Sequence, residues 1–181
     1  DPVGLGIGSL RTKLIGELKP YKPTIVRGNA SEIIALASLW ELLDAEDALD
    51  RPRGVDTTDG VDAAREAAVA LARYTGGAVV VSGEVDLVTD GTTVVRSHGG
   101  SELMSKITGC GCSQGGVLAV YATCADAFTA AVAGTAHYNL AGTRAAAVAD
   151  APASFKVAFI DELYRATGEE IAANPMCVEE A

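Results

Sequence analysis

The chain has 181 residues, of which 49% are hydrophobic and 21% are charged, and its formal net charge is −10. A chain of this length buries roughly 70% of the surface that its unfolded form exposes, so it forms a core without disulfides or a structural metal. The composition therefore excludes intrinsic disorder and a disulfide-stapled scaffold, and it indicates one globular domain over residues 1–181.

The net charge and the number of cysteines limit the classes of partner and the cellular compartment that we expect. An acidic surface repels phosphate backbones and no cluster of lysine or arginine offsets it, so we expect small-molecule ligands and no nucleic acid. The four cysteines lack the spacing of a zinc site, and so few of them favour a cytoplasmic protein. The most apolar stretch, 115–141, is interrupted by Asp126, His137 and Asn139, so we expect no membrane span.

The first part of the chain predicts a helix that leads into a strand, followed by a second helix. Leucine and isoleucine recur at helical spacing over residues 10–18, and a short apolar run at 24–26 follows two prolines. The next helix is expected to begin near Ser31, with Asn29 or Ser31 as its N-cap. The stretch 44–59 is rich in charge, glycine and proline, which indicates an exposed excursion.

The remainder predicts another helix-to-strand unit, a hairpin and a helical C-terminal part. Asp90-Gly91 lies between two segments rich in β-formers, which is a strong signal for a two-residue hairpin. The expected helices are 62–74, 112–124, 125–149 and 154–173, and the expected strands are 78–81, 85–89 and 92–97. Helices that alternate with apolar strands favour a mostly parallel sheet covered on both faces.

Glycine-containing clusters follow three of the predicted strands, at 27–29, 82–84 and 108–112. Ligands of parallel α/β sheets bind at the carboxyl ends of the strands, so we expect these clusters to line a site. The sharpest is Thr108-Gly109-Cys110-Gly111-Cys112, directly before a long apolar helix. Its backbone N–H groups and the helix dipole suit a phosphate, although glycines before a helix also serve simply as a tight turn.

Four further side chains are candidates for chemistry. Cys112, in the first helical turn, is either a base or nucleophile or a small packed residue. Arg27 suits phosphate oxygens and Glu32 suits magnesium, and the alternative is an ordinary ion pair between them. Asp1 is either a metal-linked carboxylate or a solvated chain end.

In their order along the chain, these clusters resemble hydroxyethylthiazole kinases, members of the ribokinase-like superfamily. The residues that carry the resemblance are Asp1-Pro2-Val3-Gly4 with Arg11-Thr12, Arg27 to Ile33, Gly83 to Gly91, and Lys106 to Cys112. The resemblance implies a ribokinase-like three-layer α/β fold with a central, mostly parallel sheet. It extends to about Ala173 and corresponds to roughly the last two-thirds of a family member, so the N-terminal part of the fold is expected to be missing.

The resemblance also implies an activity and a set of site residues. The activity is ATP-dependent, magnesium-requiring phosphorylation of the alcohol of 4-methyl-5-(2-hydroxyethyl)thiazole in thiamine salvage, by a homotrimer with active sites at subunit boundaries. By position, Arg27 and Ser82 contact ATP, Gly109 and Gly111 form the anion hole, Gly109 also lies beside the thiazole alcohol, Cys112 occupies the position of the base, and Asp1 and Glu32 are linked to magnesium.

Two alternatives stay open at this point. One is a ribokinase-like kinase of another small hydroxymethyl heterocycle. The other is a non-catalytic, nucleotide-binding remnant of the fold.

Overall fold

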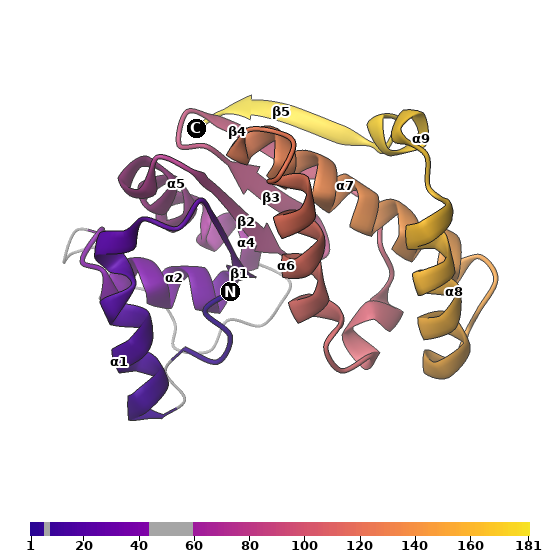
Figure 1. Ribbon diagram of the computed structural model, residues 1–181, viewed down its shortest axis with the longest axis horizontal. Coiled ribbons are helices and arrows are strands. Elements are labelled where there is room, and N and C mark those ends of the chain that lie inside the picture. The colour runs from indigo at the N-terminus through magenta and orange to yellow at the C-terminus, as the bar shows by residue number, and fades with distance from the viewer. Residues whose placement is uncertain (6–7, 44–59) are drawn as a thin grey trace.

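The computed structural model describes residues 1–5, 8–43 and 60–181 (Figure 1). The predicted excursion at 44–59 lies outside the described residues. In chain order the elements are α1 (Ser9–Glu17), β1 (Ile25–Asn29), α2 (Ala30–Leu39), α4 (Gly60–Ala63), α5 (Arg65–Thr75), β2 (Ala78–Ser82), β3 (Asp86–Thr89), β4 (Thr93–Ser97), α6 (Cys110–Tyr121), α7 (Ala127–Ala146), α8 (Pro152–Arg165), α9 (Gly168–Ala172) and β5 (Met176–Glu180), with 3₁₀ turns at Lys19–Tyr21 and Glu102–Lys106.

The described strands form one sheet in the order β1-β2-β3-β4-β5. β1 and β2 are parallel, with Ile25 opposite Ala78, whereas the other three pairs are antiparallel. The expected α/β class is confirmed, but the expectation of a mostly parallel sheet is wrong for these strands. Three residues separate β2 from β3 and three separate β3 from β4, which is too short for a parallel crossover.

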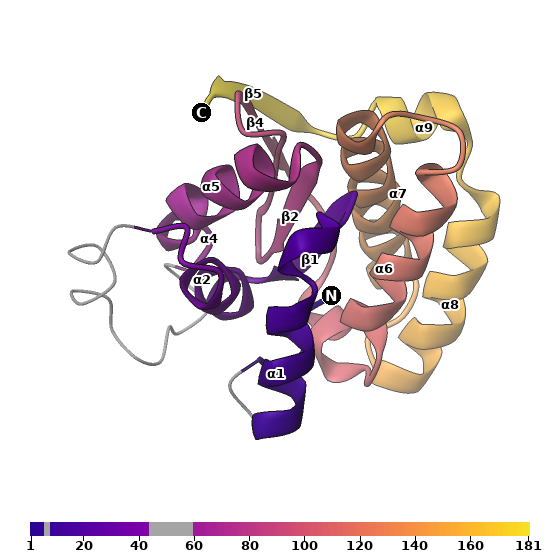
Figure 2. The ribbon, with the colours of Figure 1, turned by 60° about the vertical axis from the view of Figure 1, so that its left-hand side comes forward.

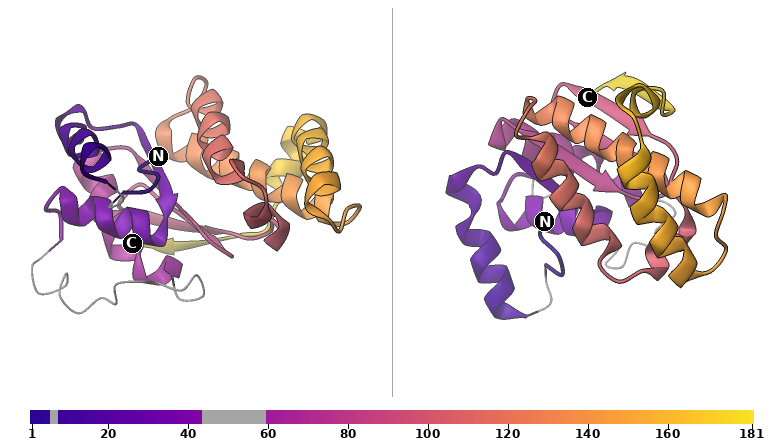
Figure 3. Two further views of the ribbon diagram at one scale, coloured as in Figure 1. Left: turned by 90° about the horizontal axis from the view of Figure 1, so that it is seen from below. Right: turned by 45° about the vertical axis from the view of Figure 1, so that its right-hand side comes forward.

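Helices cover both faces of this sheet, as a three-layer fold requires. On one face Val79, Val81 and Leu87 pack with α2 and α5, and on the other Val80 and Val88 pack with α6 and α7. Figure 2 shows the sheet between these two layers, and Figure 3 shows α8, in gold, on the outer side of α7. No helix in the described ranges is both long and apolar enough to cross a bilayer.

Several local predictions are confirmed. Asn29 caps α2 through a capping box with Glu32. The hairpin at Asp90-Gly91 also forms, with Asp90 accepting hydrogen bonds from the backbone N–H groups of Thr92 and Thr93, but its loop has three residues rather than the predicted two. The helix expected over 62–74 corresponds to α4 and α5, and Gly76 ends α5 with φ +71°, the left-handed conformation that glycine adopts at helix ends.

The C-terminal part differs from its prediction. The helix expected over 154–173 is two helices, α8 and α9, because Ala166 leaves the helical conformation and Thr167 caps a new helix. Residues 176–180 form β5, an antiparallel edge strand beside β4 that we did not predict. Most of its side chains are exposed, so it lacks the apolar run by which the other strands were found.

Candidate active site

The site is centred on Arg27, in β1. β1 and β2 are neighbours in parallel register, so Arg27 and Ser82 reach the same edge of the sheet. The guanidinium donates hydrogen bonds to Gln114 Oε1 from Nε (2.9 Å), to Asp1 Oδ2 from Nη1 (3.2 Å) and to Ser82 Oγ from Nη2 (2.9 Å). Two of the predicted site residues, Asp1 and Ser82, therefore contact a third, Arg27.

The glycine-rich turn approaches Arg27 from the other side. It follows the 3₁₀ turn Glu102–Lys106 rather than a strand, which corrects the prediction for 108–112. Gly109, with φ +85°, is the N-cap of α6, and Cys112 is exposed in the first turn of that helix, as predicted. The first turn leaves the N–H groups of Gly111 and Cys112 without intrahelical acceptors, so they are available to an anion.

Gly111 lies directly against the guanidinium. A Cβ built at this position would be 3.0 Å from Nη2 and 3.3 Å from Nη1 of Arg27. A side chain here would therefore push the fork away from the helix, and glycine permits the close approach. The guanidinium of Arg27 and the glycine-rich turn at residues 108–112, which we call the anion turn, thus form one surface in which positive charge and free N–H groups are adjacent.

Glu32 does not pair with Arg27, so the ordinary ion pair across the turn is wrong for this chain; Arg27 pairs with Asp1 instead. Glu32 Oε2 accepts from the Asn29 N–H (2.9 Å) within the capping box, and Oε1 accepts from the Gly4 N–H (3.1 Å). Glu32 therefore connects the start of α2 to the Asp1-Pro2-Val3-Gly4 segment. Asp1 is not simply a solvated end, because only 18% of its side chain is exposed and its carboxylate pairs with Arg27.

These two carboxylates are the residues that suit a cation. No group of three or more histidine, cysteine, aspartate or glutamate side chains suited to a metal occurs in the described part of the chain. Magnesium in nucleotide sites commonly uses one or two carboxylates, with water and phosphate oxygens as the other ligands. Asp1 and Glu32 offer hard oxygen atoms that retain lone pairs beyond the hydrogen bonds above, so this donor set fits magnesium brought in with a nucleotide.

A buried carboxyl group, Asp86, supports the loop after β2. Its Oδ1 accepts from the Gly83 N–H at 2.8 Å, next to Ser82. Burial raises the pKa of Asp86 to about 6, although the Gly83 N–H, the Asn139 amide and the charge of Arg27 act to lower it. From the sequence we expected the cluster 82–84 to line a site, but nothing in the sequence indicated that Asp86 is buried.

A second group of polar contacts holds the anion turn from within. The Tyr138 hydroxyl, on α7, donates to the backbone carbonyl of Cys110 and is 2.7 Å from Ser113 Oγ. Ser113 Oγ in turn donates to the same carbonyl at 2.9 Å. Burial raises the pKa of the Tyr138 phenol well above its ordinary value, so the group is a neutral donor at physiological pH.

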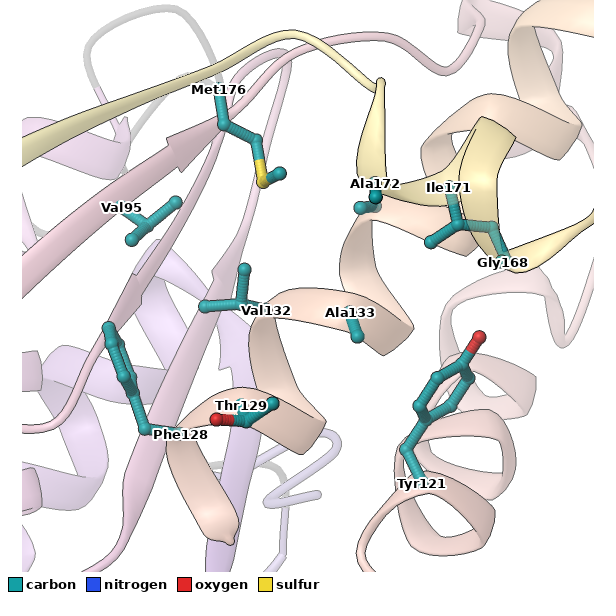
Figure 4. A pocket seen from close by; sticks show the side chains of 11 residues that line it. Val95, Tyr121, Phe128, Thr129, Val132, Ala133, Gly168, Ile171, Ala172 and Met176 are labelled. Atoms are coloured by element: carbon teal, nitrogen blue, oxygen red, sulfur yellow. The ribbon is translucent and has the colours of Figure 1, made fainter. Parts of the chain in front are cut away.

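Two cavities differ in their relation to these residues. One, of about 340 Å³, is lined by Asp1 and Arg27 together with residues of β1 and α6. The other, of about 390 Å³, lies between α6, α7, α9 and the β4–β5 edge and contains none of the predicted site residues (Figure 4). The first cavity therefore adjoins the candidate site, and the second is apolar space away from it.

Comparison with known proteins gives a consistent result. The model of the Hydroxyethylthiazole kinase family matches residues 1–169. The chain is 48% identical over 185 residues to "Hydroxyethylthiazole kinase" of Bifidobacterium animalis subsp. lactis (strain AD011), with 97% of this chain and 61% of that protein covered. It is 47% identical over 173 residues to the protein of the same name from Clavibacter sepedonicus, with 95% of this chain and 60% of that protein covered.

A solved structure agrees. The structure of the hydroxyethylthiazole kinase protein from Pyrococcus horikoshii OT3 superposes with a TM-score of 0.80 at 27% identity, covering 100% of this chain and 64% of that one. The chain spans about three-fifths of the length of the curated relatives it matches. On the family match and these identities, the chain belongs to the hydroxyethylthiazole kinase family.

Proposed function

We propose that this protein transfers the γ-phosphoryl group of ATP to the alcohol of 4-methyl-5-(2-hydroxyethyl)thiazole, in thiamine salvage. The observation that carries the proposal is the surface formed by the Arg27 fork and the first turn of α6, with Gly111 against the guanidinium. Membership of the family supports the same activity. Phosphoryl transfer depends mainly on positioning and on neutralising charge, and this surface supplies both.

In this mechanism Arg27 binds phosphate oxygens through its terminal nitrogens, and Ser82 holds one edge of the guanidinium. The N–H groups of Gly111 and Cys112 face the transferring phosphoryl group, while Gly109 turns the chain so that the alcohol can approach. Cys112 is the proposed base, since its exposed thiol sits in the first turn of α6. A base contributes late in a loose transition state, so we expect positioning to matter more than Cys112.

Magnesium is part of the proposal. Asp1 and Glu32 would hold it, directly or through water, together with the phosphates. When bound, it would neutralise charge on the phosphate oxygens. The chain's own contribution is to fix the two carboxylates, Asp1 by Arg27 and Glu32 by the N–H groups of Gly4 and Asn29.

The test is a coupled assay of ADP release with the purified protein, ATP, magnesium and a panel of primary alcohols. We expect release that depends on the thiazole alcohol, a kcat/KM at least tenfold above that for other hydroxymethyl heterocycles, and loss of turnover with a chelator. A preference under tenfold indicates a kinase of another heterocycle. Binding of ATP without ADP release from any alcohol indicates a non-catalytic nucleotide-binding protein.

The proposal extends to assembly and location, namely a cytoplasmic homotrimer with active sites at subunit boundaries. Leu10, Leu14 and Leu18 are exposed at successive turns of α1 and its C-terminal end, which supplies apolar surface for subunit contacts. Light scattering on the purified protein tests the trimer, and a monomer at micromolar concentration contradicts it.

A further inference from the structure

Gln114 is a polar side chain buried in the candidate site, and no role has been assigned to it so far. It lies in the second turn of α6, and 2% of the residue is exposed. Its Oε1 accepts a hydrogen bond from Arg27 Nε at 2.9 Å, across 87 residues of sequence. Burying an amide is costly unless it is hydrogen-bonded, so this contact accounts for a polar group at that position.

The contact acts on the orientation of the guanidinium. Of the five N–H groups of Arg27, those on Nε, Nη1 and Nη2 donate one bond each, to Gln114, Asp1 and Ser82. Nε joins the side-chain stem to the guanidinium and its N–H lies in the guanidinium plane, so a hydrogen bond from Nε restricts rotation of the planar group. Among the described residues each terminal nitrogen makes one of these hydrogen bonds, so each keeps one further N–H for a ligand.

Gln114 also belongs to the helix that carries the anion turn. Gly111, three residues earlier, is the position whose Cβ would touch both terminal nitrogens of Arg27. The hydrogen bond from Gln114 therefore ties the fork to α6 itself. Asp1 and Ser82 reach Arg27 from outside that helix, and they do not set its distance from the anion turn.

We propose that Gln114 is a positioning residue for ATP, which orients the Arg27 fork relative to the anion turn so that both meet the same phosphates. The proposal rests on the proposed function and deepens it. It concerns nucleotide affinity, because Gln114 would act through Arg27 and would touch neither the alcohol nor the reacting atoms.

The experiment compares Gln114→Met, which keeps the length and removes the acceptor, with Gln114→Asn, which keeps the polarity but withdraws the acceptor by one carbon. Calorimetry measures the Kd of a non-hydrolysable ATP analogue in the presence of magnesium. Steady-state kinetics measure the KM for ATP and the KM for the alcohol. We expect each variant to bind the analogue about tenfold more weakly, with KM for the alcohol changed less than twofold. Gln114→Glu, which keeps an acceptor oxygen in place, should bind more tightly than Gln114→Met.

The deciding arm is a double-mutant cycle with Arg27→Lys, which keeps the charge but has no fork to orient. If Gln114 acts through Arg27, Gln114→Met changes the Kd of Arg27→Lys less than twofold. A tenfold loss in both backgrounds, or no loss in either, overturns the proposal. Analogue binding without ADP release overturns the proposed function and leaves the Kd comparison valid, whereas a wild-type protein that binds no ATP overturns both.

Discussion

Asp86 offers a direct test of the energetics of the loop after β2. The residue is 5% exposed, and the pKa of its carboxyl rises from 3.8 to about 6, mainly through burial, which corresponds to about 3 kcal/mol. Because the folded state holds the proton more tightly than the unfolded state, this contribution to stability is fully present below pH 3.8. It is lost as the pH rises through about 6.

The perturbation is Asp86→Asn, which cannot titrate but keeps an oxygen for the Gly83 N–H. Between pH 7.5 and pH 5 the wild type should gain about 1.4 kcal/mol of unfolding free energy from Asp86, and the variant should gain none of it. Urea unfolding of both proteins at the two pH values measures the difference, and the other carboxylates cancel in the comparison. A difference between wild type and variant that is the same at both pH values would refute the reasoning.

Three further predictions concern the turn and the core. Gly109→Ala should lower kcat about 100-fold, because φ +85° at this position disfavours a side chain. Cys112→Ala should lower kcat only about tenfold, because a base contributes less than positioning. Steady-state kinetics in which Cys112→Ala is the more damaging change would contradict the assigned roles. Tyr138→Phe should cost about 1 kcal/mol in urea unfolding, because the Cys110 carbonyl loses a donor, and an unchanged midpoint would count against that contact. Gly77→Ala should lower the free energy of unfolding by at least about 3 kcal/mol, because its Cβ would be 2.1 Å from the Thr24 carbonyl oxygen. The control, Gly16→Ala in α1, has room for the methyl group and should be neutral or stabilising. Similar melting temperatures for the two variants would contradict this prediction.

The sequence was most informative where a local rule decides the structure. The α2 cap and the Asp90-Gly91 hairpin depend on residues within a few positions of one another, and the positions of both were predicted correctly, although the hairpin loop is one residue longer than expected. Strand direction was not predictable in the same way, because a fully apolar run suits a buried strand of either direction. β5 was missed since an exposed edge strand has little apolar pattern to detect.

The candidate site also contains residues that were predicted from the sequence and residues that were not. Arg27, Ser82 and the 108–112 turn were found because chain segments that end at one edge of a sheet tend to meet, although the turn reaches that edge from a 3₁₀ segment. The sequence pattern did not show which side chains connect the glycine-rich turn to the rest of the fold. The sequence shows a polar pair, Ser113-Gln114, at the start of an apolar helix and gives no partner for either residue.

Those partners follow from how α6 packs. Its position on the sheet turns Gln114 toward Arg27, and its packing against α7 brings Ser113 within 2.7 Å of the Tyr138 hydroxyl. Each polar residue thereby attaches the glycine turn to a separate layer, the sheet through Gln114 and the helical layer through Ser113. A turn made of glycines has little rigidity of its own, so these two attachments, rather than the glycines, fix where its N–H groups point.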